Sequence, residues 1–143
     1  MVVALTAVHI AIAAAWFGHK LLIPGDIRRS AGAGKAQSEA FLARLRRAQG
    51  FGILTGLGTV LSGVVLAWVV GVESVGPGVW VGAGLVAAAI ALGAIVARPA
   101  SRRLDAAVKA GDRVGANRAG AQVGRVLEIE SVLWLGALIA MVW

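Results

Sequence analysis

Two apolar stretches decide the fold of this chain: Ala48–Val70, AQGFGILTGLGTVLSGVVLAWVV, and Val79–Ala97, VWVGAGLVAAAIALGAIVA. Neither contains a charged residue, and each approaches or exceeds the roughly 20 residues that a helix needs to cross a bilayer. Two more such stretches, Val2–Ile23 and Val123–Trp143, contain few charges. Because a backbone in lipid must pair its own polar groups, all four should be helices. We therefore expect one all-α membrane domain over residues 1–143: a four-transmembrane-helix bundle with short amphipathic cytoplasmic connections.

The composition agrees with a membrane protein. Hydrophobic residues make up 59% of the 143 residues and charged residues only 15%, against about 45–50% and about 25% in soluble domains. Cys is absent, which excludes disulfide frameworks, thiolate zinc sites and iron–sulfur clusters. The opening apolar run continues past Ala13–Ala15 to Ile23 with no Lys or Arg before it, so we interpret it as a retained helix and not as a cleaved signal peptide.

The basic residues predict the orientation. All 14 lie beside the first and third connections, whereas the second, Gly71–Gly78, carries only Glu73. By the positive-inside rule the basic side is cytoplasmic, so both termini face outward from a bacterial cytoplasmic (inner) membrane. The net charge of +7 then indicates anionic lipid head groups as partners and gives no reason to expect nucleic acid. The basic residues are Lys20, Arg28, Arg29, Lys35, Arg44, Arg46 and Arg47 at the first connection, and Arg98, Arg102, Arg103, Lys109, Arg113, Arg118 and Arg125 at the third.

The two basic connections contain helix-breaking and capping signals. Pro24 and Pro99 are expected to end the first and third helices. Apolar residues at helical spacing beside Arg and Lys favour short helices that lie on the membrane surface, and the alternative is ordinary linkers with snorkelling cations. The remaining signals are a turn at Gly32–Gly34, caps at Ser38 and Ser101, and a helix end at Gly111.

His9 is the first candidate for chemistry, because it lies about 10 Å below the outer boundary of the first helix. Trp16 and Lys20 follow seven and eleven residues later, on roughly the same face. One interpretation makes His9 an axial ligand of haem iron, with Trp16 packed on the macrocycle and Lys20 meeting a propionate. The other has His9 bonded to a backbone carbonyl, Trp16 in the core and Lys20 snorkelling. His19 lies about 80° from His9 around the helix axis and is expected at the membrane–water interface. A second axial ligand of the haem would therefore have to be Met141, a residue of another protomer, or water.

Arg125, Glu128 and Glu130 place charges near the start of the fourth stretch. Glu128 and Glu130 project about 200° apart, which excludes a catalytic carboxylate pair, and Glu128 is at ion-pair spacing from Arg125. We expect a structural charge layer in which the other acid meets a cation across the bundle; a proton or anion path is the alternative. The candidate cations are Lys20, Arg47 and Arg98.

The run from His9 through Trp16-Phe17-Gly18 to Pro24 resembles the first helix of the HemJ-like and CopD-like bacterial membrane proteins. The resemblance implies a diverged four-helix member in which His9 ligates haem b. It does not extend to protoporphyrinogen oxidation, because residues 125–131 lack the Pro of the HemJ-like pattern. Nor does it extend to copper transport, because Met1 and Met141 are the only methionines.

Two functions are therefore carried forward. The first is a haem b-binding, redox-related membrane protein; whether it is an enzyme stays open. The second is a non-catalytic accessory subunit that packs on a larger membrane complex, or on another copy, through glycine-rich helix faces. A small transporter or channel is a third option. The small-xxx-small pairs are Gly52/Gly56, Gly78/Gly82 and Gly120/Gly124.

Overall fold

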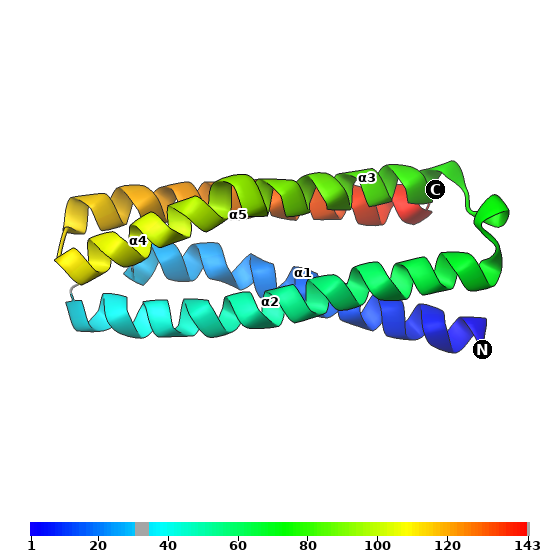
Figure 1. Ribbon diagram of the computed structural model, residues 1–143, viewed down its shortest axis with the longest axis horizontal. Coiled ribbons are helices and arrows are strands. Elements are labelled where there is room, and N and C mark those ends of the chain that lie inside the picture. Colours follow the sequence, from blue (N-terminus) through cyan, green and yellow to red (C-terminus); the bar gives the residue numbers. More distant parts are fainter. Residues whose placement is uncertain (31–34, 143) are drawn as a thin grey trace.

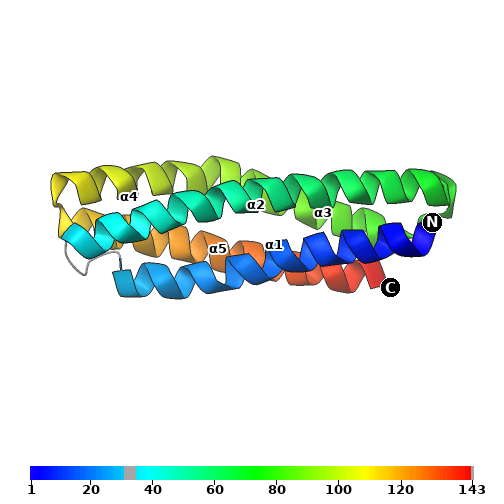
Figure 2. The ribbon, with the colours of Figure 1, turned by 90° about the horizontal axis from the view of Figure 1, so that it is seen from below.

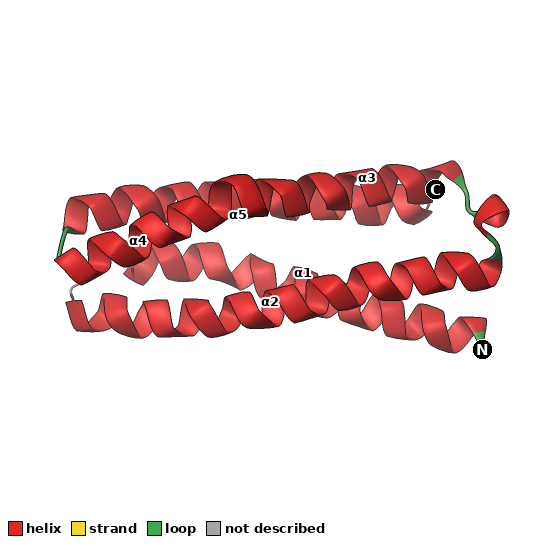
Figure 3. Ribbon diagram, in the orientation of Figure 1, coloured by secondary structure: helices red, strands yellow, loops and turns green. Residues whose placement is uncertain are grey.

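The computed structural model describes residues 1–30 and 35–142, and it consists of four long antiparallel helices (Figures 1 and 3). The third helix is continuous but carries three labels, because a π-helical segment interrupts it. The elements are α1 (Val2–Ser30), α2 (Lys35–Val70), the 3-10 turn η1 (Val72–Ser74), α3 (Pro77–Leu92), the π segment η2 (Gly93–Ala97), α4 (Arg98–Ala110) and α5 (Arg113–Val142). The expected turn at Gly32–Gly34, the side chains of Arg28 and Lys35, and Trp143 lie outside the description.

Three of the four expected spans are confirmed as helices long and apolar enough to cross a membrane: Val2–Ile27, Ala36–Val70 and Pro77–Ala110. The fourth, α5, is helical but is not a clear span by the same measure. The reason is its charge, since Arg125, Glu128 and Glu130 leave only a short uncharged stretch before Val142. The all-α class is thus confirmed.

The helices are arranged in the order α2–α1–α5–α3. Each neighbouring pair in this order is in contact, whereas no Cα atom of α2 lies within 8 Å of one in α3 among the described residues. The first two helices, α1 and α2, form one pair, and the third helix and α5 form the other. The two pairs are in contact between α1 and α5, and again between α2 and α4 (Figures 1 and 2). The central helices α1 and α5 therefore carry the contacts on which any internal site must be built.

The prediction that prolines end two helices is wrong. Pro24 lies inside α1, which continues to Ser30, because the residues after it bury Ile27 in a core. Pro99 lies in the first turn of α4, directly after the π segment. The wider π turn, in which the Arg98 N–H donates to the Gly93 carbonyl, lets the helix pass a residue that has no N–H of its own.

The connections are helical, as one of the two interpretations held, but their helices are not separate and short: they continue the long helices on either side. They are the ends of the four long helices, which here form a bundle with its own buried core; we call this part the basic end. Its apolar core explains why helix formation continues beyond the spans. Gly111 ends α4 with φ of 71°, as expected, but Ser38 and Ser101 lie within helices and are not caps. The core comprises Ile27, Phe41, Leu42, Leu45, Ala100, Leu104, Val108, Ala116, Ala119, Val123 and Leu127.

Candidate functional site

We call the rest of the bundle, away from the basic end, the apolar part. The most buried charges of its described residues are Lys20 of α1 and Glu130 of α5, which form an ion pair. Their side chains are 14% and 3% exposed. Gly93, at the start of η2, makes room for the carboxylate, because a Cβ there would lie 2.8 Å from Glu130 Oε1. The Lys20 ammonium also lies 5.1 Å from the centroid of the Trp16 ring, within reach of a cation–π interaction. Glu130 thus finds its cation across the bundle, as the charge-layer prediction allowed.

The pair lies inside the span and not at its boundary. Gly93 is 16 residues after Pro77 and five before Arg98, so it lies about 24 Å from the start of α3 and about 8 Å from Arg98 along the axis. A charge at such a depth needs a partner, and Lys20 and Glu130 provide it for each other. The expected ion pair of Arg125 with Glu128 is not among those of the described residues.

Two tryptophans pack beside the pair and close the core of the apolar part. The Trp16 and Trp134 ring centroids are 4.3 Å apart with planes at 79°, an edge-to-face contact between α1 and α5. Both side chains are buried, with Ala13, Val86, Ala89 and Ala137 around them. Trp134 Nε1 is enclosed and has no hydrogen-bond partner among the described residues. Trp16 therefore fills the core, as one of its two interpretations held.

His9 is oriented by a hydroxyl of α2. Its Nδ1 lies 2.9 Å from Ser62 Oγ. The single proton of that hydroxyl is directed to backbone carbonyls, with Gly58 O at 2.6 Å, so Nδ1–H donates to Ser62 and Nε2 keeps its lone pair. His9 also forms a hydrogen bond with the Thr59 backbone, and its ring lies against Gly63, where a Cβ would be 3.9 Å from Nε2. The half-buried His9 is therefore held by α2, with Nε2 as its unprotonated nitrogen.

The three residues predicted to hold haem do not form a haem pocket within the chain. Helix α2 packs directly on the relevant face of α1: a Cβ at Gly63 would lie 3.1 Å from His9 Cε1, and one at Gly56 would lie 2.9 Å from the Trp16 ring. Lys20 is engaged by Glu130. A macrocycle between α1 and α2 would have to separate helices that are in van der Waals contact. Ligation of haem by His9 stays a prediction, and it requires access to Nε2 from outside the α1–α2 contact.

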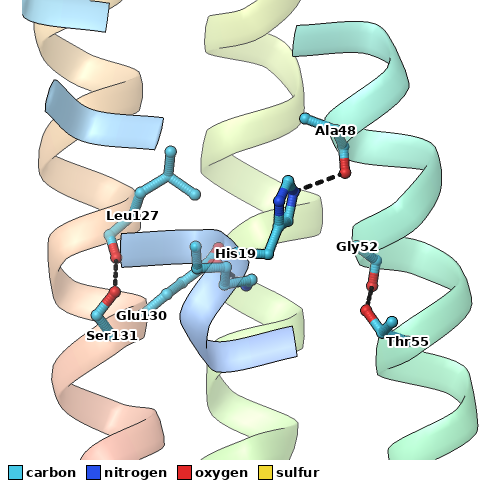
Figure 4. A network of polar contacts seen from close by, with 8 residues as sticks. His19, Ala48, Gly52, Thr55, Leu127, Glu130 and Ser131 are labelled. Atoms are coloured by element: carbon cyan, nitrogen blue, oxygen red, sulfur yellow. Dashed lines mark hydrogen bonds and ion pairs between the residues drawn. The ribbon is translucent and has the colours of Figure 1, made fainter. Parts of the chain in front are cut away.

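The other candidates are placed apart from His9. His19 Nε2–H donates to the Ala48 carbonyl at 2.9 Å (Figure 4). The His19 ring also meets the Phe51 ring edge-on. Met141 packs on α3, where a Cβ at Gly82 would lie 2.6 Å from its Cγ, so it is engaged away from His9. No cluster of three or more His, Asp or Glu side chains in the described part is placed to hold a metal ion.

The sequence predicts Lys20 as a partner for an acid, but it does not predict two contacts that define the site: that of Gly93 with Glu130 and that of Ser62 with His9. Gly93 offered no signal beyond being a glycine in an apolar helix. Ser62 was recognisable only as a group able to bond between helices, because the pairing of α1 with α2 sets its register against His9.

Comparisons with known proteins add no relative: no family model matches the chain, and no curated protein or solved structure is significantly similar to it. The resemblance to HemJ-like and CopD-like proteins therefore stays a prediction.

Proposed function

We propose that this chain is a non-catalytic accessory subunit of a larger membrane complex, with all four helices crossing the bacterial cytoplasmic membrane. The basic end then faces the cytoplasm, in keeping with the positive-inside rule. Although α5 is not a clear span alone, it lies between α1 and α3, and its buried carboxylate is neutralised by Lys20. An α5 outside the membrane would leave α1 and α3 without the helix that joins them.

The observation that carries the proposal is the outer face of α3, which is lined by exposed small residues that no helix of this chain covers. Lipid tails are as apolar as leucine, so helices associate in membranes through close contact of small residues and not through apolarity alone. The exposed face of α2 is lined by large residues such as Ile53, Leu54 and Leu57, whereas on the third helix large exposed residues flank the small ones: Trp80 and Val81 before them, and Ile90 and Ile95 at their edge and after them. We call the α3 surface the small-residue face; it comprises Ala83, Gly84, Ala87, Ala88 and Ala91.

Several glycines of the helices already contact this chain. Gly56, Gly58 and Gly63 of α2 pack against α1, and Gly82 packs against α5. Gly84 differs from these four, because the position of its Cβ has no atom within 4 Å, as is also true of Gly18 and Gly124. This difference supports α3, and not the glycine-rich face of α2, as the docking helix.

The test is purification of the tagged chain from native membranes in a mild detergent. We expect a partner at fixed stoichiometry, and we expect Ala88→Leu/Ala91→Leu to release it, because two larger side chains hold the helices apart. The control is Ala11→Leu/Ala14→Leu, which adds the same side chains at the same spacing on an exposed part of α1. A solitary chain in the wild type, or equal release by both variants, would overturn the proposal.

A second candidate, haem b binding through His9, is favoured by one observation, the contact of His9 Nδ1 with Ser62, which makes Nε2 the nitrogen with the lone pair. A histidine that ligates iron commonly donates its other N–H to a protein group, as Nδ1–H does here to Ser62. The haem would then lie on the outside of α1, between this chain and a second protein. This candidate predicts a Soret band in the purified complex that disappears in His9→Ala.

A further inference from the structure

A groove between α4 and α5 at the basic end has the features of an anion site. It is an open groove of about 480 Å³, and between its polar side chains it is lined by alanine and glycine, so no large side chain fills it. Arg103 of α4 and Arg118 of α5 line it, with Gln122 beside them. Neither arginine forms an ion pair with a carboxylate of the described residues.

One acid lines the groove but forms no ion pair with these arginines. Asp112 lies in the turn between α4 and α5, at the end of the groove farthest from Arg98, where its Oδ1 accepts a hydrogen bond from the Gly115 N–H at 2.9 Å. The carboxylate on α4, Asp105, is engaged by Arg46 and by Lys109. The groove therefore has two guanidinium groups against one carboxylate, and the guanidinium groups suit a phosphate because their planar forks bind its oxygens in pairs.

The position of the groove indicates the source of the phosphate. Arg103 is five residues beyond Arg98, where the apolar part of the third helix ends, so it lies about 8 Å past that boundary. A bilayer's head-group layer extends about 5–8 Å on each side of its hydrocarbon. The arginine side chains can therefore reach back into the layer that contains lipid phosphates.

We propose that the α4–α5 groove binds the phosphate-bearing head group of an anionic phospholipid, with Arg103 and Arg118 on the phosphate and the alanine lining under the glycerol. The site goes beyond the proposed accessory function and does not depend on it. It requires only that the third helix crosses the bilayer.

The test measures binding of phosphatidylglycerol and phosphatidylcholine to the full chain in neutral detergent, by native mass spectrometry. We expect selective retention of phosphatidylglycerol and about tenfold or greater weakening in Arg103→Gln/Arg118→Gln, because charged hydrogen bonds are lost. The control Arg102→Gln/Arg113→Gln removes the same charge from exposed positions on the same helices outside the groove, and should weaken binding less than about threefold. Ala106→Leu, which fills the groove without a charge change, should also weaken binding.

Three results would overturn the site. Equal weakening by both arginine pairs would show diffuse attraction. No preference for phosphatidylglycerol over phosphatidylcholine would show that no anionic lipid is selected. Full competition by millimolar inorganic phosphate or glycerol phosphate would assign the groove to a soluble anion and not to a lipid.

Discussion

Breaking the Lys20–Glu130 pair should cost far more stability than replacing both of its members. The two side chains are almost enclosed, so Lys20→Met leaves a buried carboxylate and Glu130→Leu leaves a buried ammonium without its partner. Removal of one member of a buried pair costs about 3–5 kcal/mol, whereas replacement of both by apolar residues of similar volume is close to neutral. We therefore expect each single variant to lose about 3 kcal/mol and the double variant less than about 1 kcal/mol.

The assay is a double-mutant cycle from reversible unfolding in mixed micelles, followed by tryptophan fluorescence, because Trp16 and Trp134 lie beside the pair. The internal control is the exposed pair Arg46–Asp105 at the basic end, neutralised as Arg46→Gln/Asp105→Asn. Exposed pairs couple by less than about 1 kcal/mol. Additive losses at Lys20 and Glu130, or coupling no larger than in the control pair, would refute the placement of this pair in the core.

Three smaller changes test the packing around the pair by the same unfolding measurement. Gly56→Ala places a Cβ 2.9 Å from the Trp16 ring and should cost about 1–3 kcal/mol of stability. The control Gly50→Ala adds a Cβ with no atom within 4 Å and should not destabilise the protein. Equal effects of the two variants would contradict the close contact of α1 with α2. Ser62→Ala removes the acceptor of His9 Nδ1–H and should cost about 0.6 kcal/mol, so a loss above about 2 kcal/mol would be inconsistent with a simple interhelical hydrogen bond. Trp134→Phe removes an enclosed N–H that has no partner among the described residues, so it should cost less than about 1 kcal/mol of stability. Trp134→Ala removes the whole ring and should cost about 3–5 kcal/mol. Similar costs for the two variants would count against the burial of the Trp134 side chain.

Hydrophobic length predicted the helices well, because a span of apolar residues has few alternatives in lipid. It did not predict where they end. Pro24 and Pro99 are local signals, and a local signal is overridden when residues beyond it, such as Ile27 and Leu104, bury apolar surface in a core formed by distant parts of the chain. The π segment before Pro99 is the local adjustment that allows this continuation.

The candidate site was predictable in part. The common face of His9, Trp16 and Lys20 follows from helical spacing, but spacing on one helix cannot say what lies opposite. The opposite helix differs along α1: α2 presents Ser62 to His9, whereas α5 presents Trp134 to Trp16 and Glu130 to Lys20. A set of residues that looks like one binding stripe is therefore divided between two interfaces.

The absorption spectrum of the natively purified protein, recorded together with its subunit composition, tests most directly whether the polar residues of the span serve packing within this chain. We expect a protein without a Soret band that purifies with a partner at constant molar ratio. A Soret band that disappears in His9→Ala but persists in His19→Ala would contradict this expectation.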